Sequence, residues 1–214
     1  MGAPVVSPDR PARRRSVYRI LPPRPFLAAI IMLLFTFLLY VIEAYDVSTG
    51  LALDEEGIVA RDPSHLDSVL WAPLLHAGWA HLESNTLPFL IFGFLAMAGG
   101  LRQFVLVTAI VWLTSGLGVW FFSPPGSDTV GASGVIFGWL VFLLFRGFFA
   151  GSAKQILLAV VLFFLWGGVL LGVLPGQPGV SWQAHLFGAL GGILAARMVA
   201  GAARRRDAGE LMPR

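Results

Sequence analysis

Ser133 and His185 are the two residues of this sequence whose types could carry out a nucleophilic reaction together. Each lies in an apolar stretch, Ser133 within the sequence Gly-Ala-Ser-Gly-Val-Ile-Phe-Gly of residues 131–138. A serine hydroxyl is a weak nucleophile until an adjacent base removes its proton, and histidine is the commonest such base. His185 is the only histidine after residue 81, and no Asp or Glu lies between residues 130 and 203. These residues predict a Ser133–His185 dyad for acyl transfer rather than a Ser-His-Asp triad.

An acyl-transfer site also needs hydrogen-bond donors for the oxyanion. His81 and Asn85 are four residues apart, so they share one face of a helix and could donate from their side chains. Ser133 is expected near a helix N-terminus, where backbone N–H groups are free. The structural alternative is an interfacial histidine and an asparagine that bonds to its own backbone, with Ser133 bonding back to its own helix.

Glycines recur at helical spacing beside both members of the dyad. One stripe contains Gly131, Gly134 and Gly138, and the other contains His185, Gly188 and Gly192. Small residues on facing stripes let two helices approach closely, which a serine-histidine hydrogen bond of roughly 2.6–3.2 Å requires. Phe137, four residues after Ser133, is expected on the same face, where its ring could pack against the imidazole of His185.

Several other chemistries are excluded by residues that the sequence lacks. The chain has no Cys, which removes disulfides, thiolate metal sites and cysteine nucleophiles. Val135 stands where a nucleophile elbow needs glycine. His76 and His81 are five apart with no Glu between them, unlike the zinc-protease helix motif. No phosphate-binding loop occurs, and neither a metal nor another cofactor is expected.

The segments that must position these residues are membrane spans. The chain of 214 residues is 57% hydrophobic and 13% charged, with a mean hydropathy of +0.77, whereas a soluble domain carries about 25% charged residues. The composition predicts an all-α polytopic membrane protein with one membrane domain over residues 26–203. A hydrocarbon core of roughly 30 Å needs helices of about 20 residues. Six are expected, at residues 26–42, 81–100, 104–122, 130–149, 156–174 and 183–203.

The positions of the basic residues predict the orientation of these spans. With a cytoplasmic N-terminus, only Arg61 of the 15 basic residues falls on the external side. Residues 1–25 are expected to be a disordered basic cytoplasmic tail, residues 43–70 an acidic external loop, and residues 204–214 a cytoplasmic tail. The run Arg204 to Arg206 is explained by this topology, so no nucleic-acid partner is expected. The second, fourth and sixth helices then all begin on the external side, which places the predicted site residues at one depth.

These motifs together resemble those of the rhomboid intramembrane serine proteases, in their minimal six-helix bacterial form. Three motifs stand in order: His76-x4-His81-x3-Asn85, Gly131-x-Ser133-Gly134-x3-Gly138 and Ala184-His185-x2-Gly188-x3-Gly192. The resemblance implies that Ser133 is the nucleophile and His185 its base and later its acid. It also implies an oxyanion hole of His81, Asn85 and the Ser133 N–H group, and an aromatic position at Phe137 that stacks on the histidine.

The resemblance further implies an integral protein of the bacterial plasma membrane, with its site open to the external face. Its partners would be transmembrane protein substrates that enter from the lipid bilayer.

The sequence departs from the family's pattern at two places. The family's Trp-Arg pair in the first external loop is absent, since Ala72 follows Trp71, and Glu83 and Pro88 fall in a stretch that is usually apolar. Two other functions stay open, a catalytically silent rhomboid-like protein that binds transmembrane helices and a small transporter with histidine proton relays. The sequence leaves the substrate and the oligomeric state open.

Overall fold

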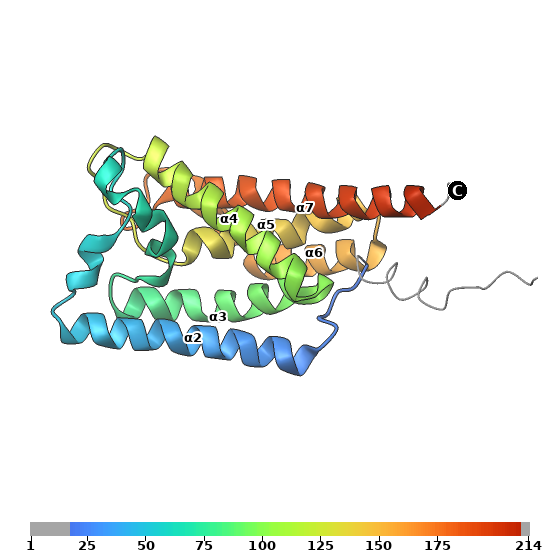
Figure 1. Ribbon diagram of the computed structural model, residues 1–214, viewed down its shortest axis with the longest axis horizontal. Coiled ribbons are helices and arrows are strands. Elements are labelled where there is room, and N and C mark those ends of the chain that lie inside the picture. The colour runs from blue at the N-terminus through green and yellow to red at the C-terminus, as the bar shows by residue number, and fades with distance from the viewer. Residues whose placement is uncertain (1–17, 211–214) are drawn as a thin grey trace, which may run out of the picture.

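The computed structural model describes residues 18–210, and within this range it contains helices and no strand. The long helices are α2 (Pro25–Ser48), α3 (Trp79–Ala96), α4 (Leu101–Phe122), α5 (Ser133–Ala150), α6 (Ala153–Trp166) and α7 (Trp182–Glu210). Short 3-10 helices are η1 (Ala52–Glu56), η2 (Pro63–His65), η3 (Asp67–Leu70), η4 (Ala72–Leu74), η5 (Met97–Gly99) and η6 (Gly167–Val173). Figure 1 shows α2 and α3 side by side along one edge of the bundle, with α7 along the opposite edge.

Six helical stretches of the described chain are long and apolar enough to cross a membrane. Four of them are single α-helices, while α3 continues into η5 and α6 continues into η6. The predicted fold class, an all-α protein with six membrane-spanning helices, is confirmed.

Helix α5, which begins at Ser133, forms the centre of the bundle. In its apolar window 67% of residues are buried, against 22% for α2 and 17% for α6. It packs most extensively against α7, and also against α6, α3 and α4. Its buried side chains include Trp139 and Phe142, both fully enclosed. The segment that carries the predicted nucleophile is therefore held on all sides, whereas α2 and α6 lie at the periphery.

The predicted helix ends differ most from the structure at α2, α6 and α7. Helix α2 continues to Ser48 rather than ending near residue 42, because Glu43 and Asp46 are buried against the protein instead of marking an exit into water. Helix α6 ends at Trp166, where the pair Gly167-Gly168 follows, and the chain continues as the 3-10 helix η6.

Helix α7 continues to Glu210, so residues 204–210 are helical rather than a separate tail. Five of its seven residues are Arg, Ala or Glu, which are good helix formers. The predicted N-terminal tail falls mostly on residues 1–17, which lie outside the described range, as do residues 211–214.

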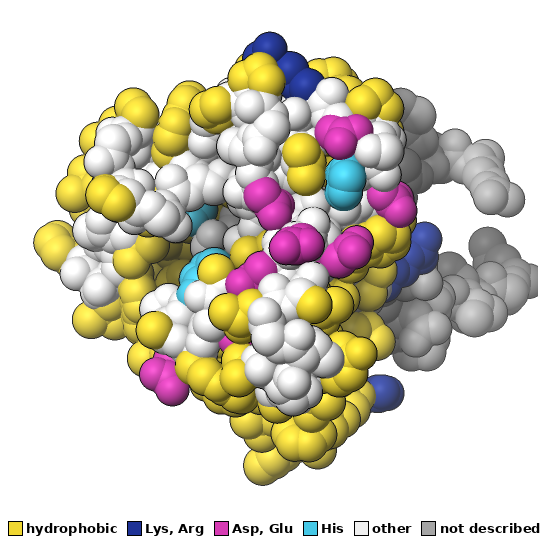
Figure 2. Space-filling view, turned by 90° about the vertical axis from the view of Figure 1, so that its left-hand side faces the viewer, with side chains coloured by type: hydrophobic (Ala, Val, Ile, Leu, Met, Phe, Trp, Pro, Cys, Tyr) yellow, Lys and Arg dark blue, Asp and Glu magenta, His cyan; other side chains and the backbone are white. Residues whose placement is uncertain are grey.

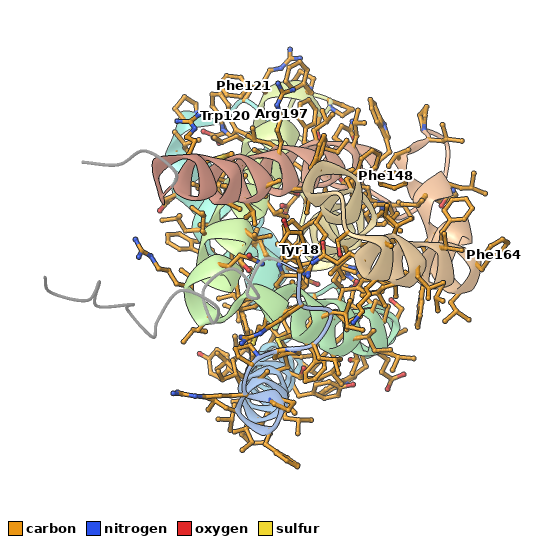
Figure 3. All side chains as sticks on the ribbon, turned by 90° about the vertical axis from the view of Figure 1, so that its right-hand side faces the viewer. Tyr18, Trp120, Phe121, Phe148, Phe164 and Arg197 are labelled. Atoms are coloured by element: carbon orange, nitrogen blue, oxygen red, sulfur yellow. The ribbon has the colours of Figure 1, made fainter. Side chains whose placement is uncertain are left out.

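The two ends of the bundle differ in charge. We call the end formed by residues 49–78 and 123–132 the acidic end (Figure 2). The opposite end, with residues 18–24, 97–102 and 146–154 and the last turns of α7, is the basic end (Figure 3). Among the described residues, Arg61 is the only Lys or Arg of the acidic end. Since α3, α5 and α7 all begin at the acidic end, their first turns lie at a similar depth, as the sequence predicts.

Candidate active site

Ser133 and His185 meet where α5 and α7 begin. Ser133 is the first residue of α5, and His185 lies in the first turn of α7. The Ser133 Oγ atom and the His185 Nε2 atom are 2.9 Å apart, within hydrogen-bond range. His185 is buried and Ser133 is partly exposed. The close approach of these two side chains, expected from the spacing of their motifs, is present in the structure.

The glycine stripes of α5 and α7 face each other and set this distance. A Cβ atom placed on Gly188 would collide with the carbonyl oxygen of Gly134. One on Gly138 would lie 2.8 Å from the carbonyl oxygen of Gly188, and one on Gly192 would lie 2.9 Å from the backbone nitrogen of Phe142. Any side chain at these positions would force the helices apart. The glycines therefore allow the backbone approach that brings serine and histidine together.

The imidazole of His185 is fixed on its face and on its far edge. The ring of Phe137 stacks on it with centroids 3.8 Å apart and planes 8° apart. On the far edge, the Nδ1 atom lies 3.0 Å from the carbonyl oxygen of Gly172, a residue of η6. A carbonyl oxygen only accepts hydrogen bonds, so the Nδ1 atom carries the proton and the Nε2 atom presents a lone pair to Ser133.

His81, in the first turn of α3, lies against the backbone that leads into Ser133. A Cβ atom on Gly131 would lie 2.6 Å from the His81 Cε1 atom, and Gly131 has a φ of +120°, where a side chain is disfavoured. The His81 Nδ1 atom accepts a hydrogen bond from the Ala77 N–H group at 3.3 Å. The proton of His81 is therefore on its Nε2 atom, which makes that atom a donor close to Gly131.

Asn85 lies one turn further along α3 and is buried. Its Nδ2 atom donates to the His81 carbonyl oxygen at 3.0 Å. This is the backbone bond that the structural alternative expects, and it ties Asn85 to its own helix. The structure thus places Asn85 next to His81, and its predicted contribution to an oxyanion hole stays a proposal.

His76 supports the same segment from the other side. It is 1% exposed, and its Nε2 atom accepts a long hydrogen bond of 3.5 Å from the Ala132 N–H group. Its ring also packs edge-on against that of His81, with centroids 5.2 Å apart. Burial is the largest cause that lowers the pKa of His76 to about 4, so this imidazole is neutral at pH 7.

Two contributors to the site were not predicted from the sequence. The Ser115 hydroxyl, in α4, donates to the Ala184 carbonyl oxygen at 2.9 Å and thereby holds the residue before His185. A polar residue within an apolar span was the available signal. The Gly172 carbonyl is the second contributor, and a backbone group in an apolar stretch leaves no residue-type signal.

The external loop also contacts the segment that leads into Ser133. Gly131, whose N–H group donates to the Ala72 carbonyl oxygen at 2.9 Å, joins the loop of residues 49–78 to the segment before Ser133. Figure 2 shows a hollow at the acidic end with histidine side chains at its edge and Asp and Glu side chains nearby. The site thus opens at the end of the bundle that carries the acidic loop.

Comparison with known proteins agrees with this architecture. The family model described as Rhomboid domain matches residues 63–202. An uncharacterized protein of Mycobacterium tuberculosis is 44% identical over 194 residues, 87% of this chain and 81% of that protein. An uncharacterized protein of Mycobacterium leprae is 42% identical over 203 residues, covering 89% and 80% of the two chains. A Bacillus subtilis protein named "Putative rhomboid protease YdcA" is 33% identical over 126 residues, 56% of this chain and 61% of that protein.

Proposed function

This chain belongs to the rhomboid family of integral membrane proteins, and we propose that it is an intramembrane serine endopeptidase. Its nucleophile is Ser133 and its general base is His185. The single observation that carries the proposal is the 2.9 Å distance between the Ser133 Oγ and His185 Nε2 atoms, in a tautomer that leaves the Nε2 lone pair free. A structural serine would need no such partner, because it can bond back to its own helix.

The first chemical step is attack of the Ser133 oxygen on the carbonyl carbon of the substrate's peptide bond. As the new C–O bond forms, the hydroxyl proton passes to the Nε2 atom of His185, which becomes an imidazolium. The charge is shared with the Nδ1–H group, which donates to the Gly172 carbonyl. This carbonyl orients the ring as a triad carboxylate would, but it contributes a dipole in place of a full negative charge.

The oxyanion that forms in this step needs donors aimed at it. The backbone N–H group of Ser133 is one, because the first N–H groups of a helix have no partner within the helix. The Nε2–H group of His81 is the second, since its Nδ1 atom is already an acceptor. Asn85 is the third, through the hydrogen of its Nδ2 atom that does not bond to His81. The start of α5 also favours negative charge through the helix dipole.

The leaving amine takes its proton from the His185 imidazolium, and an acyl-enzyme on Ser133 remains. A water molecule then attacks the ester carbonyl while His185 accepts the water's proton, and Ser133 is released with its hydroxyl restored. Water reaches the site through the hollow at the acidic end (Figure 2).

Substrates in this proposal are transmembrane segments that unwind locally. A regular helix keeps its carbonyl groups hydrogen-bonded, so a peptide bond becomes open to attack only where the helix is broken. The basic end, which carries Arg19, Arg24, Arg102, Arg146, Lys154 and Arg205, faces the cytoplasm by the positive-inside rule. The active site then opens to the external side of a bacterial plasma membrane.

A fluorophosphonate probe, which phosphonylates activated serines, tests the proposal on the purified protein in detergent. We expect the wild type to be labelled on Ser133, and both Ser133→Ala and His185→Ala to lose labelling at an unchanged unfolding temperature. Ser127→Ala is the matched control, because Ser127 lies in an exposed loop and bonds only to the Pro124 carbonyl through its side chain. It should be labelled like the wild type.

Two results would contradict the proposal. One is a folded wild-type protein that stays unlabelled, which would favour a catalytically silent protein that binds transmembrane helices. The other is equal labelling of Ser133→Ala, which would place the reactive serine elsewhere.

A further inference from the structure

The proposed base, His185, takes its orientation from a backbone carbonyl. The carbonyl oxygen of Gly172 lies 3.0 Å from the Nδ1 atom of His185, and this contact is buried. Because this oxygen can only accept, it selects the tautomer in which Nδ1 carries the proton. The opposite tautomer would put a proton on Nε2 and make His185 unable to accept the proton of Ser133. This one carbonyl therefore favours the tautomer in which the dyad can act.

The local sequence explains why the Gly172 carbonyl is free to bond to a side chain. In a 3-10 helix each carbonyl accepts from the N–H group three residues later, as Leu171 accepts from Leu174 at 3.0 Å. The next carbonyl, that of Gly172, would accept from residue 175. Residue 175 is a proline, which has no N–H group.

Proline also changes the backbone just before it. Leu174, the residue preceding Pro175, is extended with φ −89° and ψ 139°, the conformation that a following proline favours. The chain therefore leaves the helix at Leu174 and cannot curl back to cover the Gly172 oxygen. Pro175 acts twice, by removing the competing donor and by turning the chain away.

Glycine at position 172 permits the close approach. A Cβ atom there would lie 2.8 Å from the His185 Nδ1 atom and 3.0 Å from the Cζ atom of Phe137. Both distances are shorter than van der Waals contact, so any other residue would push η6 away from the imidazole and from the ring that stacks on it. Gly172 is also the only buried residue of η6.

Most side chains of the segment that carries this carbonyl lie on the outside of the bundle. The span formed by α6 and η6 is the least buried of the six, and the buried residues of α6 are Gln155, Ala159 and Leu162. Phe164, near the end of α6, is 82% exposed and points away from the bundle (Figure 3). Trp166 and Leu170 pack against the core of the bundle, and Gly172 brings η6 into contact with His185.

From this arrangement we infer that Pro175 is a positioning residue for the dyad: it leaves the Gly172 carbonyl unbonded by backbone, so that this carbonyl holds His185 in the tautomer of a base. The inference rests on the proposed function for its catalytic consequence, but the tautomer itself is a property of the folded protein. Pro175 acts on the dyad only through Gly172.

Pro175→Ala restores an N–H group three residues after Gly172 and releases Leu174 from its extended conformation. The matched control is Pro178→Ala in the same loop. Pro178 lies in the turn closed by the hydrogen bond from the Val180 N–H group to the Gln177 carbonyl, with Gly179 at φ +71°. The N–H group restored at position 178 would face the carbonyl three residues earlier, that of Pro175. This carbonyl plays no part at the site.

Two readouts separate positioning from a general structural effect. The first is saturation kinetics with the fluorophosphonate, which gives a limiting rate of phosphonylation and an apparent affinity. For Pro175→Ala we expect the limiting rate to fall about tenfold and the affinity to stay within about twofold, with both unchanged in Pro178→Ala. The second is the ¹⁵N spectrum of histidine-labelled protein, with the His185 signals assigned by His185→Gln. The wild type should show a protonated Nδ1 atom, and Pro175→Ala a mixture of both tautomers.

A backbone substitution provides a second route if Pro175→Ala fails to fold. Replacing Val173 by its α-hydroxy acid turns the Gly172–Val173 peptide bond into an ester, whose carbonyl is a weaker acceptor. The same change at Leu171 is the control. The Val173 ester should reproduce the slower labelling and the mixed tautomer without adding a donor.

The inference is overturned if the folded Pro175→Ala protein has the His185 tautomer and the limiting rate of the wild type. If Pro175→Ala does not fold, the same result in the Val173 ester overturns it. A change confined to affinity would also overturn it, because η6 would then act on access to the site. If the wild type is unlabelled by the probe, the proposed function fails, while the ¹⁵N spectra still decide whether Pro175 controls the tautomer.

Discussion

The ring of Phe137 lies parallel to the imidazole of His185, with centroids 3.8 Å apart and planes within 8°. The two residues come from different helices, α5 and α7, and the far edge of the same imidazole meets the Gly172 carbonyl. The histidine is thus restrained in three directions, by the ring of Phe137, the oxygen of Gly172 and the hydroxyl of Ser133.

Replacing Phe137 by leucine should slow the reaction of Ser133. Loss of an aromatic pair costs about 0.5–1.5 kcal/mol, so we expect the limiting rate of fluorophosphonate labelling to fall roughly two- to tenfold. Phe137→Tyr keeps the ring and should label faster than Phe137→Leu. Equal rates for leucine and phenylalanine would show that stacking has no part in orienting His185.

Gly188→Ala should separate α5 from α7, because the added methyl group meets the Gly134 carbonyl oxygen. Overpacking of this kind typically costs about 1–3 kcal/mol, so we expect a lower unfolding temperature together with lost labelling of Ser133. The control is Gly201→Ala on the same helix, where no atom lies within 4 Å of the new Cβ atom.

Thermal unfolding in detergent and probe labelling would be measured for both glycine variants. Gly201→Ala should leave labelling unchanged and raise stability by up to about 1 kcal/mol through helix propensity. If Gly188→Ala labels like the wild type, the close approach of the two helices is not what positions the dyad.

Acid should destabilise the fold through His76. Its pKa falls from 6.5 in the unfolded chain to about 4 in the fold, because the charged form is buried. A depressed histidine pKa means that the unfolded chain binds the proton more tightly. Its contribution to stability is therefore complete above pH 6.5 and is lost as the pH falls toward 4.

The same pKa shift gives the size of this acid effect. Each pKa unit corresponds to about 1.4 kcal/mol, so full protonation of His76 should lower the free energy of unfolding by an amount on the order of 3 kcal/mol. His76→Gln keeps a polar side chain that does not titrate, so its stability should fall less between pH 7 and pH 4.5. Unfolding temperatures across this range would be compared for the two proteins, with His65→Gln as the control because His65 is exposed. Parallel curves for wild type and His76→Gln would remove His76 as the cause.

Arg146 is a buried cation at the basic end, and its contribution to the stability of the fold can be measured. Its guanidinium is buried and donates to the carbonyl oxygen of Arg19, and Gln155 donates to the same oxygen at 3.0 Å. Among the described residues it forms no ion pair with Asp or Glu. Arg146→Met would leave no carboxylate unpaired, and Gln155 would still satisfy the carbonyl.

We therefore expect Arg146→Met to change the free energy of unfolding by no more than about 1 kcal/mol, or to raise it, because a buried charge is costly to desolvate. Phe142→Ala, which removes the ring beneath the guanidinium, should cost about 3–5 kcal/mol and serves as the positive control. A loss of several kcal/mol in Arg146→Met would show that the cation holds residues 18–24 in place.

The sequence alone determined the class of this protein, its six spans and the residues that could do chemistry. Apolar length and the positions of charges are one-dimensional properties, so the membrane helices follow from them within a few residues at most ends. The ends that differ are informative: Glu43 and Asp46 would mark an exit into water by residue type, yet they are buried within α2. A charge ends a span only where it faces solvent, and the sequence does not say which way it faces.

The candidate site residues Ser133, His185 and Phe137 were likewise identifiable from residue type and helical spacing, because the proposed chemistry requires particular side chains. Which atoms meet was decided by the tertiary structure. The bond from Asn85 to its own helix, the proton on the Nε2 atom of His81 and the contact between Gly172 and His185 all depend on how the helices pack. A backbone carbonyl is the same in every residue, so only the fold could bring the one at Gly172 to the imidazole it orients.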